Sequence, residues 1–470
     1  MIRLNTARNA HEIQAVIEIG KRRRRRKTVQ SLQQPWHHNG PTASKSSSAL
    51  RKMTKQYMEP SLNEPSGEAA KWLRPRGSNQ IGMSQFNERV VLQAIRFHGS
   101  MPKADLARLT NLSTQTVSLI INRLLDEELV IKLAPLRGKV GQPSVPIALN
   151  PDGAFSIGIK IGRRSMDIVL MDFVGKPRER SSLSYTFPDP DSLFQEIQQQ
   201  LDHLRTRLGP KLAQRLSGIG IAAPLALGGW QKQLGIAPEQ ADKWNRIDIR
   251  QQVQNMTDLP VEFAKDTAAA CVAELVAGRG RSIKSFLYVF VDTFIGGGLV
   301  IDSHLRGGLH GNAGALASIP LGLAKNGRHI APEQLLSDAS LFKLEQLFST
   351  TGLDETACVD ARALQAPWLT HTLAWLDDAA RAIALAINSA ACLLDLDEII
   401  IDGSCDRSLL EKLLTEVETA LGYYNWEGVT RPRVLAGTIG SDARAIGGAL
   451  LPLYANFAPD RDLFLKLDIT

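Results

Sequence analysis

Hydrophobic side chains in the first part of the chain recur at the spacing of amphipathic helices. Between Asn87 and Phe97 they fall at intervals of three and four residues, which predicts one helix. Gly99 ends that segment, and Pro102 opens a second helix, because proline is tolerated at the first position of a helix. Ser113 is a favourable N-cap for a third helix over residues 114–125, whose apolar positions lie on one face.

Two strand-like runs follow the third predicted helix. Leu129–Ile131 starts a strand, and Val145–Leu149 is the returning strand. Between them, residues 137–143 contain two glycines and a proline, which is typical of a flexible loop tip. Three helices followed by a two-stranded wing predict a winged helix-turn-helix domain at residues 81–150.

The pattern changes again after Asn150–Gly153, a turn that indicates a domain boundary. Short apolar runs then alternate with helical stretches, which predicts an α/β domain of two lobes at residues 151–470. The runs expected to form strands are 155–161, 166–171, 218–223, 286–291, 298–301 and 398–401. The stretches expected to form helices are 191–208, 267–277, 369–394 and 408–421.

Charge is distributed unevenly along the chain. Residues 1–80 hold 16 Lys and Arg against 5 Asp and Glu, and residues 81–150 hold 8 against 5. Residues 151–470 hold 31 Lys and Arg against 38 Asp and Glu. The basic N-terminal part, residues 1–150, is therefore expected to bind a polyanion such as nucleic acid, and the acidic part, residues 151–470, is not.

Residues 1–80 are expected to be disordered. They contain the basic run Lys21–Lys27, a serine-rich stretch at residues 44–48 and little hydrophobic periodicity. A basic arm of this kind would add non-specific affinity for DNA. A solvated tail, or a translation start placed too far upstream, explains the same pattern.

Composition excludes several classes of protein. The 470 residues include no run of 18 or more apolar residues, and no apolar secretory core follows the basic run, so we expect a cytoplasmic protein with no membrane partner. The four cysteines are scattered without a C-x-x-C pair, which argues against a zinc site and against a disulfide framework. We therefore expect reduced, buried thiols, no metal and no cofactor.

The third predicted helix carries the side chains expected to read DNA. In a helix-turn-helix, the second helix of the motif enters the major groove. Glutamine and asparagine pair with adenine edges and arginine with guanine edges, whereas serine and threonine more often contact phosphate. Lys103 and Arg108 on the preceding helix are expected to clamp the DNA backbone. The candidates at the third helix are Ser113, Thr114, Gln115, Thr116, Ser118, Asn122 and Arg123.

The predicted wing offers a second contact with duplex DNA. Arg137, Lys139 and Gln142 lie at its tip, within backbone that glycines keep adaptable. An arginine on a narrow loop can enter a minor groove, where A·T tracts have an enhanced negative potential. The alternative is that the three small helices form a packing or dimerisation module. The wing, the basic charge and the serine cap together favour double-stranded DNA as the partner.

Several segments together resemble the ROK family of repressors and sugar kinases, over about residues 76–455. They match the segment that precedes the first helix in the family's repressors, the wing, and the Asn-Asp segment with the helix after it. They also match the second glycine-rich phosphate segment and the C-terminal end of the family. The matching segments are 76–80, 137–144, 259–270, 274–278, 295–300 and 440–449. The resemblance implies an actin-like ATPase fold of two α/β lobes with a cleft between them.

The departures from the family pattern lie at the elements of phosphoryl transfer. Family kinases open with an Asp-x-Gly-x-Thr phosphate loop, whose positions here are Lys160, Gly162 and Arg164. A cation therefore replaces the acidic residue that would organise Mg²⁺ and phosphate. Asp292 and Phe294 stand where the second loop usually has glycines, whose backbone N–H groups approach phosphate.

The family's sugar-binding and zinc segments are also changed. The Glu-x-Gly-His segment falls at Ala315–Ser318, and residues 323–336 contain no cysteine for the zinc motif. Asp266 stands at the position of the family's catalytic base, with Lys265 in place of the usual asparagine, so it is a vestigial base candidate. Pairing with Lys265, or capping of the following helix, would explain Asp266 equally. The candidates for effector binding are Lys265, Asp266, Asn312 and Ser318.

These features predict a sequence-specific DNA-binding regulator, and in particular a repressor of carbohydrate-related genes. Its non-catalytic back domain would sense a sugar or sugar phosphate and would oligomerise. A ROK sugar kinase with an accessory DNA-binding head is the alternative, and a regulator controlled by a protein partner is a third hypothesis. Because one winged helix offers a small interface and family repressors pair through the back domain, we expect a homodimer or a homotetramer.

Overall fold

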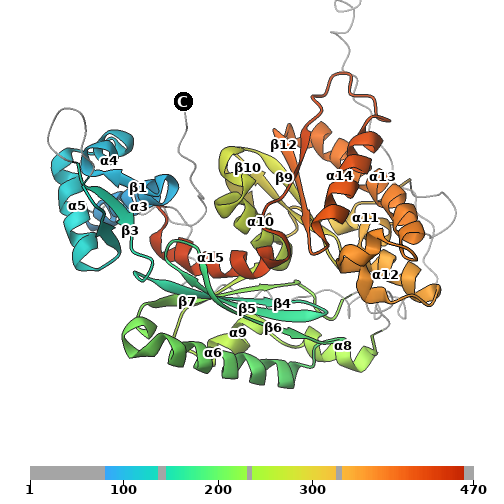
Figure 1. Ribbon diagram of the computed structural model, residues 1–470, viewed down its shortest axis with the longest axis horizontal. Coiled ribbons are helices and arrows are strands. Elements are labelled where there is room, and N and C mark those ends of the chain that lie inside the picture. Colours follow the sequence, from blue (N-terminus) through green and yellow to red (C-terminus); the bar gives the residue numbers. More distant parts are fainter. Residues whose placement is uncertain (1–79, 136–143, 230–235, 324–330, 460–470) are drawn as a thin grey trace, which may run out of the picture. The chain divides into compact units, whose positions relative to one another are not determined.

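The computed structural model describes residues 80–135, 144–229, 236–323 and 331–459 (Figure 1). Residues 1–79 of the expected basic arm, and the wing-tip candidates Arg137, Lys139 and Gln142, lie outside the described residues. We refer to residues 80–149 as the head and to residues 155–459 as the back domain.

The head combines short helices with a small antiparallel sheet in which β3 lies between β1 and β2. Its helices are α3 (Gln80–His98), α4 (Lys103–Thr110) and α5 (Thr114–Asp126). Its strands are β1 (Ser100–Pro102), β2 (Val130–Lys132) and β3 (Pro146–Leu149). The helices and the two later strands were expected, whereas β1 was not. Apart from the wing tip, these elements follow one another as in a winged helix-turn-helix.

Local sequence signals fix the ends of α4 and α5. Pro102 was expected to be the first residue of α4, but the helix begins at Lys103. Pro102 precedes it in an extended conformation (φ −65°, ψ 151°), because it belongs to β1, which pairs with β3. Asn111 ends α4 with a φ of 53°, in the left-handed region that asparagine tolerates better than most residues. Ser113 Oγ accepts the backbone N–H of Thr116 at 3.1 Å, so the predicted N-cap of α5 is confirmed.

The apolar face of α5 forms the centre of the head's core. Its buried residues are Val117, Ile120, Ile121 and Leu124. They belong to one cluster with Val91 and Ile95 of α3 and Leu106 of α4. Burying a side chain of this size stabilises a fold by about 1.5–3 kcal/mol. The core therefore fixes α5 with its opposite face toward solvent.

The first lobe of the back domain is a mixed sheet with the strand order β6-β5-β4-β7-β8. The strands are β4 (Phe155–Ile161), β5 (Ser165–Asp172), β6 (Pro177–Ser184), β7 (Leu216–Ala223) and β8 (Val261–Lys265). Helix α6 (Pro190–Ala213) lies along one face of this sheet, and α15 (Ala443–Phe457) lies along the other (Figure 1). Helices α8 (Pro238–Asn245) and α9 (Ile249–Gln254) come between β7 and β8 in the chain.

The second lobe contains a sheet with the strand order β11-β10-β9-β12-β13. The strands are β9 (Phe286–Val291), β10 (Gly296–Ile301), β11 (His304–Arg306), β12 (Glu398–Gly403) and β13 (Arg433–Ala436). The helices are α11 (Leu335–Ala339), α12 (Leu341–Thr350), α13 (Leu369–Leu394) and α14 (Arg407–Leu421). Short 3-10 turns are η2 (Arg279–Ser282), η3 (Leu316–Ser318), η4 (Glu355–Val359), η5 (Ala361–Leu364) and η6 (Gly440–Asp442). Strand β9 is buried along its whole length, as its unbroken apolar sequence predicts.

Glycines let α15 approach its neighbours backbone to backbone. A Cβ at Gly447 would lie 1.8 Å from the carbonyl oxygen of Ala269, in α10 (Asp266–Ala277). A Cβ at Gly158 of β4 would lie 2.1 Å from the carbonyl oxygen of Ala445. Side chains at these glycines would force the elements apart. The close packing therefore fixes the first turn of α15, which contains Arg444.

The end of α3 contacts both lobes. Arg96 Nη1 donates to the Phe173 carbonyl at 2.8 Å, and its guanidinium lies 5.0 Å from the Phe173 ring and 5.8 Å from that of Tyr454. Arg281, just before β9, donates to the Phe97 carbonyl at 2.9 Å and lies 5.0 Å from the Phe97 ring. We call Arg96, Phe97 and Arg281 the α3 clasp. Through it, consecutive residues of α3 contact the first and the second lobe.

In the part of the chain that the structure describes, no helix combines the length and apolarity needed to cross a bilayer. All four cysteines are free thiols; Cys271 and Cys358 are buried, but Cys392 is exposed. The expectation of buried thiols is therefore wrong for Cys392, which lies on a solvent-facing position of α13.

Candidate functional site

The solvent face of α5 is largely polar. Ser113, Thr114, Gln115 and Asn122 are exposed, and Thr116 and Ser118 are half-buried. Leu119 lies on the same face with 67 % of its surface exposed. Sequence reasoning considered only the polar residues of this face as candidates for DNA contact and passed over Leu119. The signal was available, since position 119 falls outside the apolar stripe at 117, 120, 121 and 124.

Three cations of the head, Lys103, Arg108 and Arg123, lie at its surface beside polar partners. Lys103 Nζ donates to Asn122 Oδ1 at 3.3 Å. The Arg108 side chain is 80 % exposed next to Asp105, and that of Arg123 is 45 % exposed with Glu88 at 2.6 Å. Exposed ion pairs contribute about 0–1 kcal/mol, so DNA phosphates can replace these partners at little cost.

A buried ammonium group lies at the end of β4, where the ROK resemblance would place an acidic residue. Lys160 is 4 % exposed, and its Nζ donates to Ser165 Oγ and, at 3.0 Å, to Asp167 Oδ2. Asp167 also accepts from Ser182 and Arg180. The Lys160 ammonium is therefore engaged by groups of its own lobe.

Arginines of the first lobe and of α15 reach across the cleft to the second lobe. The guanidinium of Arg444 donates to Asp292, and its Nη2 donates to Ser404 Oγ at 3.1 Å. Arg164 Nη2 lies 3.1 Å from Glu345 Oε2 in α12. These contacts hold the two walls of the cleft together.

A further arginine, Arg163 at the position of the first phosphate loop, contacts Phe294 at the position of the second. The guanidinium of Arg163 lies 4.9 Å from the centre of the Phe294 ring, a cation–π contact, and Nη2 donates to the Ala226 carbonyl at 3.2 Å. Phe294 therefore fills the space that glycines would leave open for phosphate oxygens.

The buried charges of the cleft shift one another's protonation equilibria. Burial and the neighbouring Arg444 lower the pKa of Lys160, and Asp167 opposes them. Burial raises the pKa of Asp292, but Arg444 and Lys160 outweigh it, so that this pKa lies below its usual range. Such opposing effects are typical of buried groups that compensate one another.

Little space remains between these side chains. The cleft contains a cavity of about 50 Å³, lined by residues that include Lys160, Arg163, Asp266, Asp292 and Arg444. A nucleotide does not fit this volume, and the ammonium at position 160 does not fit a Mg²⁺ ion. Asp266 is the first residue of α10, and its Oδ1 accepts the backbone N–H of Thr267 at 2.8 Å.

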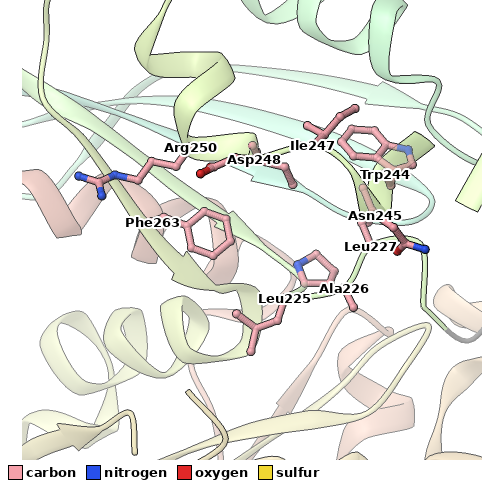
Figure 2. A pocket seen from close by; sticks show the side chains of 11 residues that line it. Leu225, Ala226, Leu227, Trp244, Asn245, Ile247, Asp248, Arg250 and Phe263 are labelled. Atoms are coloured by element: carbon pink, nitrogen blue, oxygen red, sulfur yellow. The ribbon is translucent and has the colours of Figure 1, made fainter. Parts of the chain in front are cut away.

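A second and larger pocket, of about 520 Å³, lies beside this cavity and shares Pro224 with it. It opens between the loop after β7, the segment joining α8 to α9, and β8. Figure 2 shows Phe263 facing Trp244 and Asn245 across the pocket, with Leu225 and Ala226 along one side. Its volume falls within the roughly 300–1,000 Å³ of typical small-molecule sites.

Aromatic and polar side chains line this pocket together. Trp244 is held in place by its Nε1, which donates to the Pro188 carbonyl at 2.9 Å. Asp248 Oδ1 caps α9 by accepting the Gln251 N–H at 3.0 Å. Arg250 Nε donates to the Val261 carbonyl at 2.9 Å, and its guanidinium points away from Trp244 and Asn245 (Figure 2).

The structure gathers few of the predicted effector residues. Asp266 lines the small cavity, whereas Lys265, Asn312 and Ser318 line neither the small cavity nor the larger pocket. Sequence reasoning missed Trp244, Asn245 and Asp248, because they fall between predicted elements and match no catalytic motif. Among the described residues, no group of three or more His, Cys, Asp or Glu side chains is placed to hold a metal ion.

Comparison with known proteins gives consistent results. Residues 156–454 match the ROK family. A xylose repressor of Bacillus subtilis is 25 % identical over 244 residues, which cover 52 % of this chain and 62 % of the repressor. The DNA-binding transcriptional repressor Mlc of Escherichia coli is 25 % identical over 273 residues, 56 % of this chain and 66 % of Mlc. The chain therefore spans less than two thirds of the length of each of these relatives.

A solved structure matches over a longer stretch. The crystal structure of a ROK family transcriptional regulator, described as a homologue of E. coli Mlc, superposes with a TM-score of 0.60 at 20 % identity. The match covers 82 % of this chain and 99 % of that one. At this identity the match establishes the fold, a two-lobed α/β back domain behind the head.

Proposed function

The chain belongs to the ROK family, and we propose that it is a sequence-specific DNA-binding repressor of carbohydrate-related genes. The observation that carries this proposal is the exposed polar face of α5, which the Ser113 cap and a buried apolar stripe hold toward solvent. A helix-turn-helix presents its second helix to the major groove in this way. The similarity to a xylose repressor supports the class of target genes, and the similarity to Mlc, a DNA-binding transcriptional repressor, supports the mode of action.

Selection from a random duplex library with the full chain tests the proposal. A sequence motif should be enriched and should bind in mobility-shift assays at least about 10³-fold more tightly than unrelated duplex. Selection that enriches no motif would reject DNA recognition by sequence.

The back domain is proposed to lack kinase activity. Phosphoryl transfer needs a cradle for the nucleotide phosphates, a metal organiser, a substrate clamp and a base. The cavity of about 50 Å³ and the buried Lys160 argue against the first two. An ADP-release assay with Mg²⁺, ATP and a panel of hexoses and amino sugars should show no turnover. Sugar-dependent turnover that Asp266→Asn abolishes would establish a kinase instead.

The larger pocket is proposed as the effector site, for a sugar or a sugar phosphate. Its aromatic walls and its Asn245 and Asp248 side chains suit the apolar faces and hydroxyl groups of a sugar ring. Binding to the folded state raises the temperature of unfolding. A thermal-shift screen of sugars and their phosphates should therefore find a stabilising ligand whose effect Asn245→Ala reduces. A screen in which no sugar stabilises the chain would favour control by a protein partner.

A homodimer or a dimer of dimers is proposed as the DNA-binding form. A symmetric dimer contacts two half-sites separated by a whole number of helical turns, which gives the small head a sufficient interface. Sedimentation at micromolar concentration should show the dimer, and a monomer that persists with operator present would contradict it.

A further inference from the structure

An apolar side chain interrupts the polar face of α5. Among the large apolar residues of the head that the structure describes, Leu119 is the most exposed, at 67 %. It does not belong to the head's core, to which α5 contributes Val117, Ile120, Ile121 and Leu124. The folded chain therefore leaves this leucine in water at the centre of its candidate DNA-binding surface.

Helix geometry places Leu119 in line with two side chains that can pair with bases. Gln115 precedes it by four residues and Asn122 follows it by three, and residues at these intervals lie side by side on a helix. All three lie on the solvent-exposed face of α5, the helix that this motif presents to the major groove. In a major groove entered by this face, the leucine would meet the same groove floor as the two amides.

Base edges in the major groove offer one group that suits a leucine. Adenine, guanine and cytosine present hydrogen-bonding atoms there, whereas thymine presents a C5-methyl group. Contact between Leu119 and this methyl would remove apolar surface of both from water. In an A·T pair, the methyl lies beside the adenine atoms that glutamine or asparagine pair with.

The charges around Leu119 favour DNA over an apolar protein as the occupant of this surface. Lys103 donates to Asn122 on the same face, and Arg108 lies on the adjacent helix with 80 % of its side chain exposed. Isolated exposed leucines are common on protein surfaces. This one, however, shares its helix face with Gln115 and Asn122, and Asn122 accepts a hydrogen bond from the ammonium of Lys103.

We propose that Leu119 determines specificity by contacting the C5-methyl group of a thymine, next to an adenine read by Gln115 or Asn122. This inference rests on the proposed function, because it requires the chain to bind a defined operator. It adds a residue identity and a base identity that a general helix-turn-helix assignment leaves open.

Replacing single thymines by deoxyuridine tests the contact atom by atom, because deoxyuridine lacks only the methyl group. In the selected operator, each half-site should contain one thymine whose replacement weakens binding of the wild-type chain by roughly fourfold. This factor corresponds to the free energy of burying one methyl-sized group. Leu119→Ala should bind the two operators equally. Leu119→Met, which keeps an apolar side chain, should restore sensitivity to the methyl.

The controls separate this inference from the proposed function. Leu373→Ala, at an exposed leucine of α13, should retain the full thymine preference. An enriched operator in which no thymine methyl affects binding, or in which Leu119→Ala keeps the wild-type loss, overturns the role of Leu119 and leaves the repressor proposal standing. A selection that enriches no operator overturns both.

Discussion

The interlobe cleft and the head both concentrate cations, and both groups of cations lie beside polar partners. In the cleft, Lys160 and Arg444 are almost completely buried next to Asp167 and Asp292. On the head, the Arg108 side chain is 80 % exposed next to Asp105. The cations of both regions form ion pairs, so ion pairing does not distinguish the two regions. They differ in the access of water to the paired charges.

This difference decides which cations can bind a ligand. A buried pair has already lost its hydration, and removing one member leaves an uncompensated charge in the interior. An exposed pair keeps most of its hydration, so an incoming phosphate can replace the partner. Counting Lys and Arg along the sequence treats the two groups alike, although in one they stabilise the fold and in the other they remain available.

The largest effect is expected at the buried pair. Arg444→Met should lower the free energy of unfolding by about 3–5 kcal/mol, because Asp292 would remain buried without its partner. Urea unfolding followed by circular dichroism measures this change. Arg381→Met is the matched control, since its ion pairs with Asp377 and Asp378 are exposed and should contribute less than about 1 kcal/mol. Equal losses in the two variants would contradict the distinction between the two regions.

On the head, the largest effect is expected from the amides. Gln115→Ala and Asn122→Ala should each weaken operator binding by about 1–3 kcal/mol if the amide makes a bidentate base contact. Affinity for unrelated duplex should stay nearly constant, because these contacts carry sequence information. Mobility shifts with both duplexes measure the ratio, and two variants with wild-type selectivity would show that α5 is docked differently.

A smaller effect is expected in acid. Because the pKa of Asp292 lies below its usual range, Asp292 contributes stability above the pKa of an unfolded aspartate, and this stability is lost as the pH falls through the lowered value. The urea midpoint of the wild type should therefore fall steeply below about pH 4. In the double variant Arg444→Met/Asp292→Leu, which removes both charges, the urea midpoint should fall less steeply with pH in the acid range. An equally steep fall in the wild type and in the double variant would mean that other carboxylates dominate acid unfolding.

The smallest effects on stability are expected at the exposed cations. Lys103→Gln and Arg108→Gln should change the free energy of unfolding by no more than about 0.5 kcal/mol. Each should instead flatten the slope of log K against log salt for DNA by about 0.9, the contribution of one phosphate contact. The wing cations Arg137 and Lys139 are predicted to act in the same way. Unchanged slopes would remove the corresponding residue from the DNA interface.

Much of the architecture was predictable because local signals agree with the fold. The Ser113 cap, the apolar stripe of α5 and the alternation of strands and helices after Asn150 all point to the observed elements. Strand β1 was missed because three residues carry no periodicity, and its pairing with β3 joins segments about 45 residues apart. Long-range pairing of this kind leaves no trace in a local pattern.

The chemistry of the cleft was predicted in part. The replacement of an acidic residue by Lys160 and of a glycine by Phe294 was visible in the sequence and indicated a compromised phosphate site. The partners of these residues were not visible, because Asp167, Arg163 and Ala226 come together through tertiary packing. The larger pocket was missed for the same reason, since its walls derive from segments with no shared motif.

The α3 clasp has a consequence for the entropy of association with DNA. Arg96 and Phe97 are held by different lobes, and Asn150, which follows the head, donates to the Glu128 carbonyl at 2.7 Å. The head is thus joined to the back domain by fixed contacts rather than by a flexible tether. In a dimer, two heads held in this way lose little orientational freedom when they engage their half-sites, so more of the contact energy remains as affinity. In such a dimer, the same contacts would restrict the operator spacings that both heads can engage at once.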